Sequence, residues 1–240
     1  MKKEKIFLIL VPIFAAIAIT IGYLQVANIE NDAIKFKMEY ENYNAKETRY
    51  GQTYQTLEIS KKNKIKYSNY EEIINIINKG TGIIYLGFPE CPWCRTAIPV
   101  LFDVVEDNSI DTIYYLNIKN DRDSYVVEEG KVQYALDENG NEIKGSEGYK
   151  SLLEELDEYL DDYTITVDGK TYEVGEKRIY APSVIFVKDG NVLGIQVSTV
   201  SGQKSGFDKL TEEQYEELYN IYEDYILDMT SNTCTSDSVC

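Results

Sequence analysis

The sequence has no histidine among its 240 residues, and this absence removes several kinds of chemistry at once. A Ser-His-Asp triad, a Cys-His protease site and any metal site with an imidazole ligand are therefore excluded. Positive charge is also scarce, because 41 acidic residues outnumber 24 basic ones and give a formal net charge of −17. Nucleic-acid binders neutralise phosphates with lysine and arginine, so we expect no nucleic acid as a partner.

Long apolar runs are absent except for one at residues 6–27, which carries no charge and follows the basic stub 1–5. A helix of this length crosses a hydrocarbon core of roughly 30 Å. The positive-inside rule then places the stub in the cytoplasm and the rest of the chain outside. A cleaved signal peptide is the alternative, but Gln25-Val26-Ala27 is a poor cleavage site. We expect an uncleaved signal anchor, which makes a single-pass protein of the cell membrane with an extracytoplasmic C-terminal part.

The rest of the chain divides into three parts. Residues 28–54 are polar, with AIKFKMEYENYN at 33–44 as a possible helix, and are predicted to form a stalk that leads into the domain. Residues 55–229 are predicted to form one globular domain, since their length is enough for a sizeable core. Residues 230–240 look like a flexible tail, and they contain Cys234 and Cys240, two of the four cysteines. Disulfides persist outside the cytoplasm, so pairing of cysteines is plausible there.

Within the domain, apolar periodicity and turn residues predict strands that alternate with helices, which favours the α/β class. The predicted strands are residues 54–59, 81–88, 111–118 and the two arms of hairpins around Asp168-Gly169 and Asp189-Gly190. The predicted helices are one that starts after Ser68 or Asn69, one that starts at Cys91, an acidic one over 151–163, and one that Thr211 caps.

The stretch GFPECPWCRTAIP at 87–99 holds Cys91 and Cys94 at a predicted strand-to-helix junction. Zinc ribbons also use such a CxxC pair, but here the only other cysteines lie in the tail and would make a poor tetrahedral site. The attacking species in disulfide exchange is the thiolate, and a helix N-terminus lowers a thiol pKa. The junction therefore favours a redox pair. Glu90 is expected to raise the pKa of Cys91, and Arg95 to lower it.

Together with APSVIFVKDGNV at 181–192, this motif resembles the thioredoxin-fold thiol–disulfide oxidoreductases. The CPWCR sequence and the anchor are also similar to a membrane-anchored Gram-positive subgroup described as bacteriocin-transport accessory proteins. The resemblance covers roughly residues 55–118 and 180–228. It implies a central mixed sheet flanked by helices, with residues 119–179 as an enlarged middle insertion.

The resemblance also implies roles for individual residues. Cys91 would be the nucleophile and Cys94 would resolve the mixed disulfide. The peptide bond between Ala181 and Pro182 would be cis and face the dithiol. The substrate groove would then be shaped by Pro182 and Ala181, with two further residues from the CxxC motif, Pro92 and Trp93.

Three more positions follow from the same resemblance. Pro99 is expected to kink the active-site helix. Tyr85 stands where thioredoxin has a buried aspartate that aids proton transfer, so Glu90 or water would have to take over that task. No metal or organic cofactor is implied. The implied partners are cysteine-containing exported proteins or peptides and a membrane redox partner.

Several alternatives stay open at this point. The protein could instead be a thioredoxin-fold binding or accessory module for an exported peptide or membrane complex, with little redox turnover. The direction of electron flow is not determined by the Pro-Trp dipeptide. The tail cysteines Cys234 and Cys240 could form a local disulfide, or they could relay electrons to Cys91 and Cys94.

Overall fold

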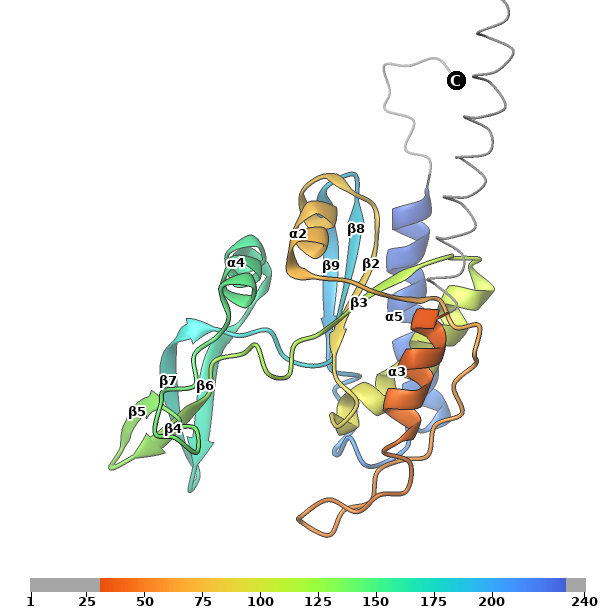
Figure 1. Cartoon of the computed structure of the whole chain (residues 1–240). Helices are drawn as coiled ribbons and strands as arrows, with labels where there is room; N and C mark the ends of the chain where they lie inside the picture. The colour runs from red at the N-terminus through yellow and green to blue at the C-terminus, as the bar shows by residue number, and fades with distance from the viewer. Residues whose placement is uncertain (1–30, 232–240) are drawn as a thin grey trace, which may run out of the picture.

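The computed structural model of the chain describes residues 31–231, in which helices surround a central sheet (Figure 1). The predicted anchor at 6–27 and the tail cysteines Cys234 and Cys240 lie outside the described residues. Between residues 31 and 231, no helix combines the length and the apolar character needed to cross a membrane.

The central sheet is mixed and has five strands. They are, in spatial order, β1 (Ile65–Tyr67), β3 (Ile113–Asn117), β2 (Gly82–Gly87), β8 (Ser183–Lys188) and β9 (Asn191–Val197). β1, β3 and β2 are parallel, and β8 is antiparallel to β2 and to β9. The register pairs Gly87 with Asn117 and Leu86 with Ser183. The chain therefore leaves β2, leaves β3 and enters β8 at the same end of the sheet.

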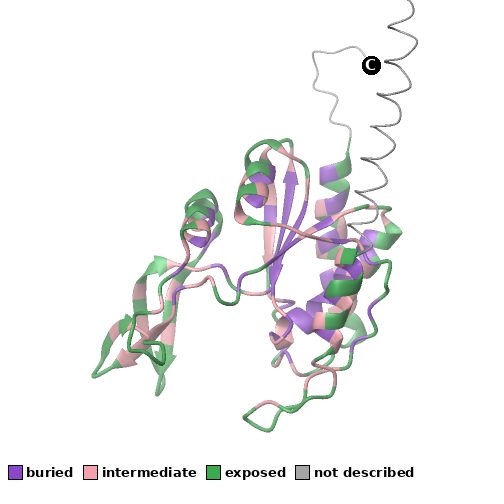
Figure 2. Cartoon of the chain, in the orientation of Figure 1, coloured by how far each residue is buried: buried purple, intermediate pink, exposed green. Residues whose placement is uncertain are grey.

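Helices cover both faces of the sheet, because successive side chains of a strand point to opposite faces. Ile83 and Tyr85 pack with α3 (Pro92–Asp107) and α5 (Glu212–Thr230) on one face. Ile84 and Leu86 pack with α2 (Tyr70–Lys79) and α4 (Glu147–Glu155) on the other. Figure 2 shows β2 and β8, in the middle of this sheet, as buried along most of their length. The α/β class with a mixed sheet between helices is thus confirmed.

Local hydrogen bonds fix the helix starts that the sequence predicted. Asn69 caps α2 by accepting the backbone N–H of Glu72. Thr211 and Gln214 form a capping box at the start of α5. Such bonds satisfy N–H groups that have no partner inside the helix, and they involve residues only three positions apart.

The prediction of a stalk over residues 28–54 is wrong for the described part of that segment. Residues 31–41 form a helix, and its Ala33, Phe36 and Tyr40 are at most 1% exposed. The rings of Phe36 and Tyr40 stack with centroids 4.3 Å apart. Polar residues dominate the segment, but three apolar side chains at helical spacing are enough to bury one face against the domain.

The predicted strand at 54–59 is also absent, although its alternation does bury Leu57 and Ile59. Their backbone N–H groups bond to side chains and not to a neighbouring strand. Leu57 donates to Asn44 Oδ1 at 3.0 Å, and Ile59 donates to Glu41 Oε1 at 2.8 Å.

Residues 119–179 hold two hairpins and a helix, set apart from the central sheet in Figure 1. The hairpins are β4 (Tyr125–Glu128) with β5 (Lys131–Tyr134), and β6 (Asp162–Val167) with β7 (Lys170–Lys177) around the predicted Asp168-Gly169 turn.

The acidic helix, predicted at 151–163, lies earlier in the chain as α4 and is followed by a 3₁₀ turn at Asp157–Tyr159. It starts early because Ser146 caps it. Gly148 then allows a close approach to α2, since a Cβ there would lie 2.4 Å from the Tyr70 ring.

Candidate functional site

Cys91 and Cys94 stand where β2 leads into α3, at the predicted junction. Cys91 is the N-cap residue of α3, and its Sγ accepts the backbone N–H of Cys94 at 3.1 Å. Cys91 is 5% exposed, Cys94 is fully buried, and both are free thiols. A free N–H at the start of the helix therefore points at the sulfur of Cys91, which is an arrangement that stabilises a thiolate.

The segment around Pro182 lies against Cys91, as expected. The Ala181–Pro182 peptide bond is cis. The Cys91 Sγ lies 3.2 Å from the carbonyl oxygen of Ala181, to which the thiol donates. The structure thus brings together the CxxC motif and the proline segment, which are far apart in the sequence.

Pro92 and Trp93 are half-buried beside the dithiol, and a glycine that the sequence did not single out packs against them. A Cβ at Gly206 would lie 2.7 Å from the backbone nitrogen of Trp93. The Gly206 carbonyl also accepts the Thr96 hydroxyl at 3.0 Å. The loop after β9 therefore covers the start of α3. Pro99 lies inside α3, which continues to Asp107, and the kink at Pro99 stays a prediction.

Burial raises the pKa of the Cys94 thiol well above its usual range, and the neighbouring Cys91 adds to this rise. The Phe88 backbone and the nearby Tyr85 hydroxyl act in the opposite direction and lower this pKa. The hydroxyls of Tyr85 and Tyr40 lie 2.9 Å apart, and both side chains are fully buried. Burial raises the pKa of both hydroxyls well above the usual range, so they stay protonated and can donate.

Tyr222 of α5 brings another buried hydroxyl to this region. Its oxygen has no hydrogen-bond partner among residues 31–231. Burial raises the pKa of Tyr222, and the nearby Cys94 raises it further. The sequence analysis did not single out this hydroxyl, because Tyr222 fits the apolar face of its helix as any large side chain would.

Glu90, next to Cys91, is held by two donors. Its Oε1 accepts Lys119 Nζ at 2.6 Å and the Tyr43 hydroxyl at 2.8 Å. Burial alone would raise the pKa of Glu90, but these hydrogen bonds outweigh it and lower the pKa below its usual value. Glu90 is therefore ionised and paired at neutral pH, which makes it a poor proton acceptor.

Arg95 has a structural role that the sequence did not predict. It is fully buried and donates to the carbonyls of Tyr40 and Gln55 and to Asn44 Oδ1, each at 2.6 Å. These acceptors all belong to the N-terminal segment. Arg95 thus ties residues 40–55 to the start of α3.

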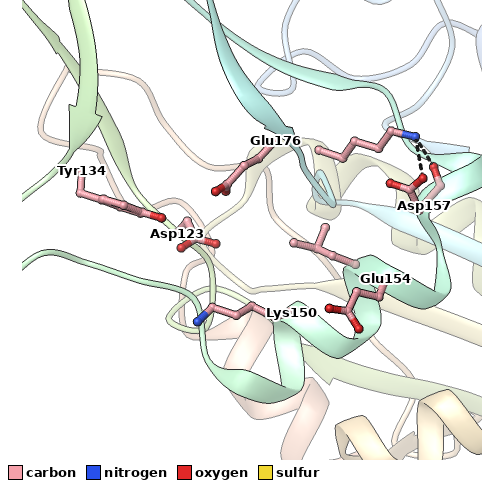
Figure 3. Close-up of a pocket in the computed structure, with 8 residues that line it drawn as sticks. Asp123, Tyr134, Lys150, Glu154, Asp157 and Glu176 are labelled. Carbon is pink, nitrogen blue, oxygen red and sulfur yellow. Dashed lines mark hydrogen bonds and ion pairs between the residues drawn. The ribbon is translucent and has the colours of Figure 1, made fainter.

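Two of the hollows on the surface of the described chain are lined by several charged side chains. One of about 620 Å³ adjoins the dithiol through Glu90, and its wall includes Tyr43, Tyr54, Lys119 and Phe207. The other, of about 500 Å³, lies in the middle segment, where Asp123, Tyr134, Lys150, Glu154 and Glu176 point inward (Figure 3). Neither hollow is lined by a cysteine, but the first lies next to the dithiol loop, because Glu90 in its wall precedes Cys91 in the chain.

Within residues 31–231, no group of three or more Cys, Asp or Glu side chains is arranged to hold a metal ion. A comparison of the sequence with protein-family models gives no match, and neither does a comparison with curated proteins. The functional interpretation therefore depends on the geometry of the site.

Proposed function

We propose that the protein is a thiol–disulfide oxidoreductase with a thioredoxin-like fold. In this proposal residues 6–27 anchor it in the cell membrane, and the domain acts outside the cytoplasm on cysteine-containing exported proteins or peptides. The observation that carries the proposal is the position of Cys91 as the N-cap of α3, with its sulfur bonded to the Cys94 N–H and against the Ala181 carbonyl. The strand order and the helices on both faces of the sheet support it.

The chemistry proceeds by two exchanges of sulfur partners. The Cys91 thiolate attacks one sulfur of a substrate disulfide, a bond forms between them, and the other substrate sulfur leaves as a thiolate that takes up a proton. Cys94 then loses its proton and attacks the Cys91 sulfur, so that the second substrate sulfur leaves in the same way. Two electrons and two protons pass from the dithiol to the substrate, and the reverse sequence oxidises a substrate dithiol. A partner dithiol or disulfide returns the protein to its starting state.

The second exchange needs a thiolate at buried Cys94, and Tyr85 supports it in this proposal. No carboxylate occupies the position of Tyr85, where thioredoxin has an aspartate. A tyrosine of raised pKa does not accept the Cys94 proton, but it stabilises the thiolate by donating a hydrogen bond. The Tyr40 hydroxyl at 2.9 Å keeps the Tyr85 hydroxyl oriented. The Cys91 charge, which also raises the pKa of Cys94, disappears once Cys91 is in a disulfide.

Replacing Tyr85 with phenylalanine is expected to slow the second exchange on the order of tenfold at neutral pH. A hydrogen bond to a charged group contributes about 1.5–3 kcal/mol, so its loss raises the pKa of Cys94 by at least about one unit. The rate should recover as pH rises, because the thiolate fraction then rises in the variant. The measurement is the pH profile of substrate release from a preformed mixed disulfide at Cys91.

Tyr222→Phe is the matched control for Tyr85→Phe. It removes a buried hydroxyl that has no partner among residues 31–231, so the release rate should not change. Identical pH profiles for Tyr85→Phe and the unaltered protein would show that Tyr85 has no part in this step.

The proposed function is tested by equilibrating the protein, with Cys234 and Cys240 replaced by serine, in glutathione buffers and trapping free thiols. A reversible couple at Cys91 and Cys94 is expected. A midpoint near or below about −250 mV would make the protein a reductant with a membrane electron donor, and one near about −120 mV would make it an oxidant. If no reversible couple forms, the enzymatic proposal fails and the binding or accessory module takes its place.

A further inference from the structure

Three segments meet at the end of the sheet that carries the dithiol. They are the chain leaving β2 toward Cys91, the chain leaving β3 at residues 118–123, and the chain entering β8 at residues 178–182. The carboxyl ends of parallel strands, where connections diverge, are a common place for ligands to bind in α/β sheets. The second and third segments each bring one arginine to this end.

Arg122, in the segment after β3, lies beside the dithiol loop. Its Cζ is 5.0 Å from the centroid of the Phe88 ring, and the Phe88 carbonyl accepts the backbone N–H of Cys91 at 3.2 Å. Arg122 is also close enough to interact electrostatically with both Cys91 and Cys94. This cation–π contact with Phe88 holds the guanidinium beside the dithiol loop.

Arg178, in the segment before β8, is close to Arg122, and its charge acts on the Arg122 guanidinium. Burial and the nearby Arg178 lower the pKa of Arg122. The Arg178 Nη1 donates to the Asp123 carbonyl at 2.9 Å, and its Cζ is 4.4 Å from the Tyr163 ring centroid. Tyr163 in turn meets Tyr180 edge-on, next to the Ala181–Pro182 segment.

Neither arginine has an anionic partner in the described part of the chain. Every ion pair closer than 4.0 Å among residues 31–231 uses a lysine. The Nε of Arg122 is buried without a hydrogen-bond partner among the same residues.

The aspartates on either side of Arg122 are engaged elsewhere. Asp121 accepts the Tyr70 hydroxyl at 3.0 Å, and Asp123 accepts the Gly145 N–H at 2.7 Å. Although the protein has 41 acidic residues, no carboxylate pairs with either of these two arginines within residues 31–231.

We propose that Arg122 and Arg178 bind a carboxylate of the substrate polypeptide, so that the dithiol acts preferentially on cysteines flanked by aspartate or glutamate. This inference rests on the proposed function, because the site lies beside Cys91 and its ligand arrives with the substrate cysteine. A carboxylate is the anion that an unmodified polypeptide supplies, and it matches the guanidinium fork in shape.

The net charge of −17 makes this preference easy to distinguish from a general electrostatic effect. The field of the whole protein would attract basic peptides and repel acidic ones. A preference for acidic peptides can therefore arise only from local positive charge at the site.

The experiment uses the full chain with Cys234 and Cys240 replaced by serine, and three pentapeptides that differ at one position. They are Ala-Xaa-Cys-Ala-Ala with glutamate, glutamine or lysine at Xaa, each carrying a neutral 2-pyridyl disulfide on its cysteine. Release of thiopyridone reports attack by Cys91. The glutamate peptide should react about five- to tenfold faster than the lysine peptide at low salt, and the ratio should fall as salt rises.

Arg122→Gln combined with Arg178→Gln should reduce this ratio to about one. Lys170→Gln, an exposed change of the same charge at the tip of the β6–β7 hairpin, should leave it unchanged. A ratio at or below one in the unaltered protein, or a preference that survives in the double variant, overturns the inference.

A second readout separates this inference from the proposed function. Trp93, the single tryptophan, lies between the two cysteines, so its fluorescence reports binding of the same peptides with serine in place of cysteine. If no peptide reacts but the glutamate peptide binds more tightly through the two arginines, the oxidoreductase proposal fails and the anion site stands. If all three peptides react and bind alike, the oxidoreductase proposal stands and the anion site fails.

Discussion

Cys91→Ser is expected to reduce thiol–disulfide exchange by at least on the order of a thousandfold, because a serine hydroxyl does not ionise near neutral pH and is a far weaker nucleophile than a thiolate. The substitution changes one buried atom for a smaller one, so the fold should be retained. Turnover is measured with a disulfide peptide and a dithiol donor. The variant should still bind peptides, since the neighbouring Trp93 and Ala181 are unchanged.

Cys94→Ser is the informative counterpart of Cys91→Ser. It leaves the first exchange intact but removes the group that releases the substrate, so a mixed disulfide with Cys91 should accumulate. Mass spectrometry of the trapped species identifies which cysteine holds the peptide. A trapped peptide on Cys94 in Cys91→Ser, or undiminished turnover in either variant, would contradict the assigned roles.

The same assay decides the role of the tail cysteines. Replacement of Cys234 and Cys240 by serine should leave turnover unchanged if they form a local disulfide. A fall in turnover, with the first exchange unaffected, would indicate that they relay electrons to Cys91 and Cys94.

Arg95→Ala is expected to lower the free energy of unfolding by about 3–5 kcal/mol, the largest stability effect we expect from a single substitution in the domain. Arg95 is fully buried, and its removal leaves the Gln55 carbonyl without its donor. The Tyr40 carbonyl and Asn44 Oδ1 each lose one donor and keep the N–H groups of Tyr43 and Leu57. Unsatisfied buried acceptors cost about 1–3 kcal/mol each, although relaxation and water entry recover part of the sum. Urea unfolding followed by circular dichroism measures the loss.

Arg95→Lys should recover less than half of that stability, because a lysine has one compact ammonium group and cannot reach three acceptors that a planar guanidinium spans. Arg49→Ala, at an exposed arginine of the same N-terminal segment, should change the free energy of unfolding by less than about 0.5 kcal/mol. A loss below about 1 kcal/mol for Arg95→Ala would mean that the N-terminal segment is not held through this residue.

The features that were predicted correctly from the sequence share a physical property. Each depends on interactions between residues only a few positions apart in the chain. Asn69 and Thr211 cap helices through bonds to residues three positions ahead. The Asp168-Gly169 turn closes its hairpin because both residues adopt positive φ, at 50° and 77°. The CxxC motif also marks a helix start because the interactions involved are between residues close in the sequence.

The errors of the sequence interpretation occur where long-range packing outweighs local character. Residues 31–54 look polar, yet Phe36 and Tyr40 are buried because Tyr85 and Tyr115 of the sheet offer them an aromatic surface. The helix predicted at 151–163 lies earlier because the approach of α4 to Tyr70 makes Gly148 acceptable inside a helix.

The sequence by itself determined the class of the fold and the strand-to-helix junction that carries Cys91 and Cys94, on which the proposed chemistry depends. The tertiary structure alone decided what surrounds them: the Tyr85–Tyr40 hydroxyl pair, the pairing of Glu90 with Lys119, and the two arginines beside the dithiol loop. The reason is the sheet register, which brings together the ends of β2 and β3 and the start of β8. No local pattern in the chain encodes which side chains meet there.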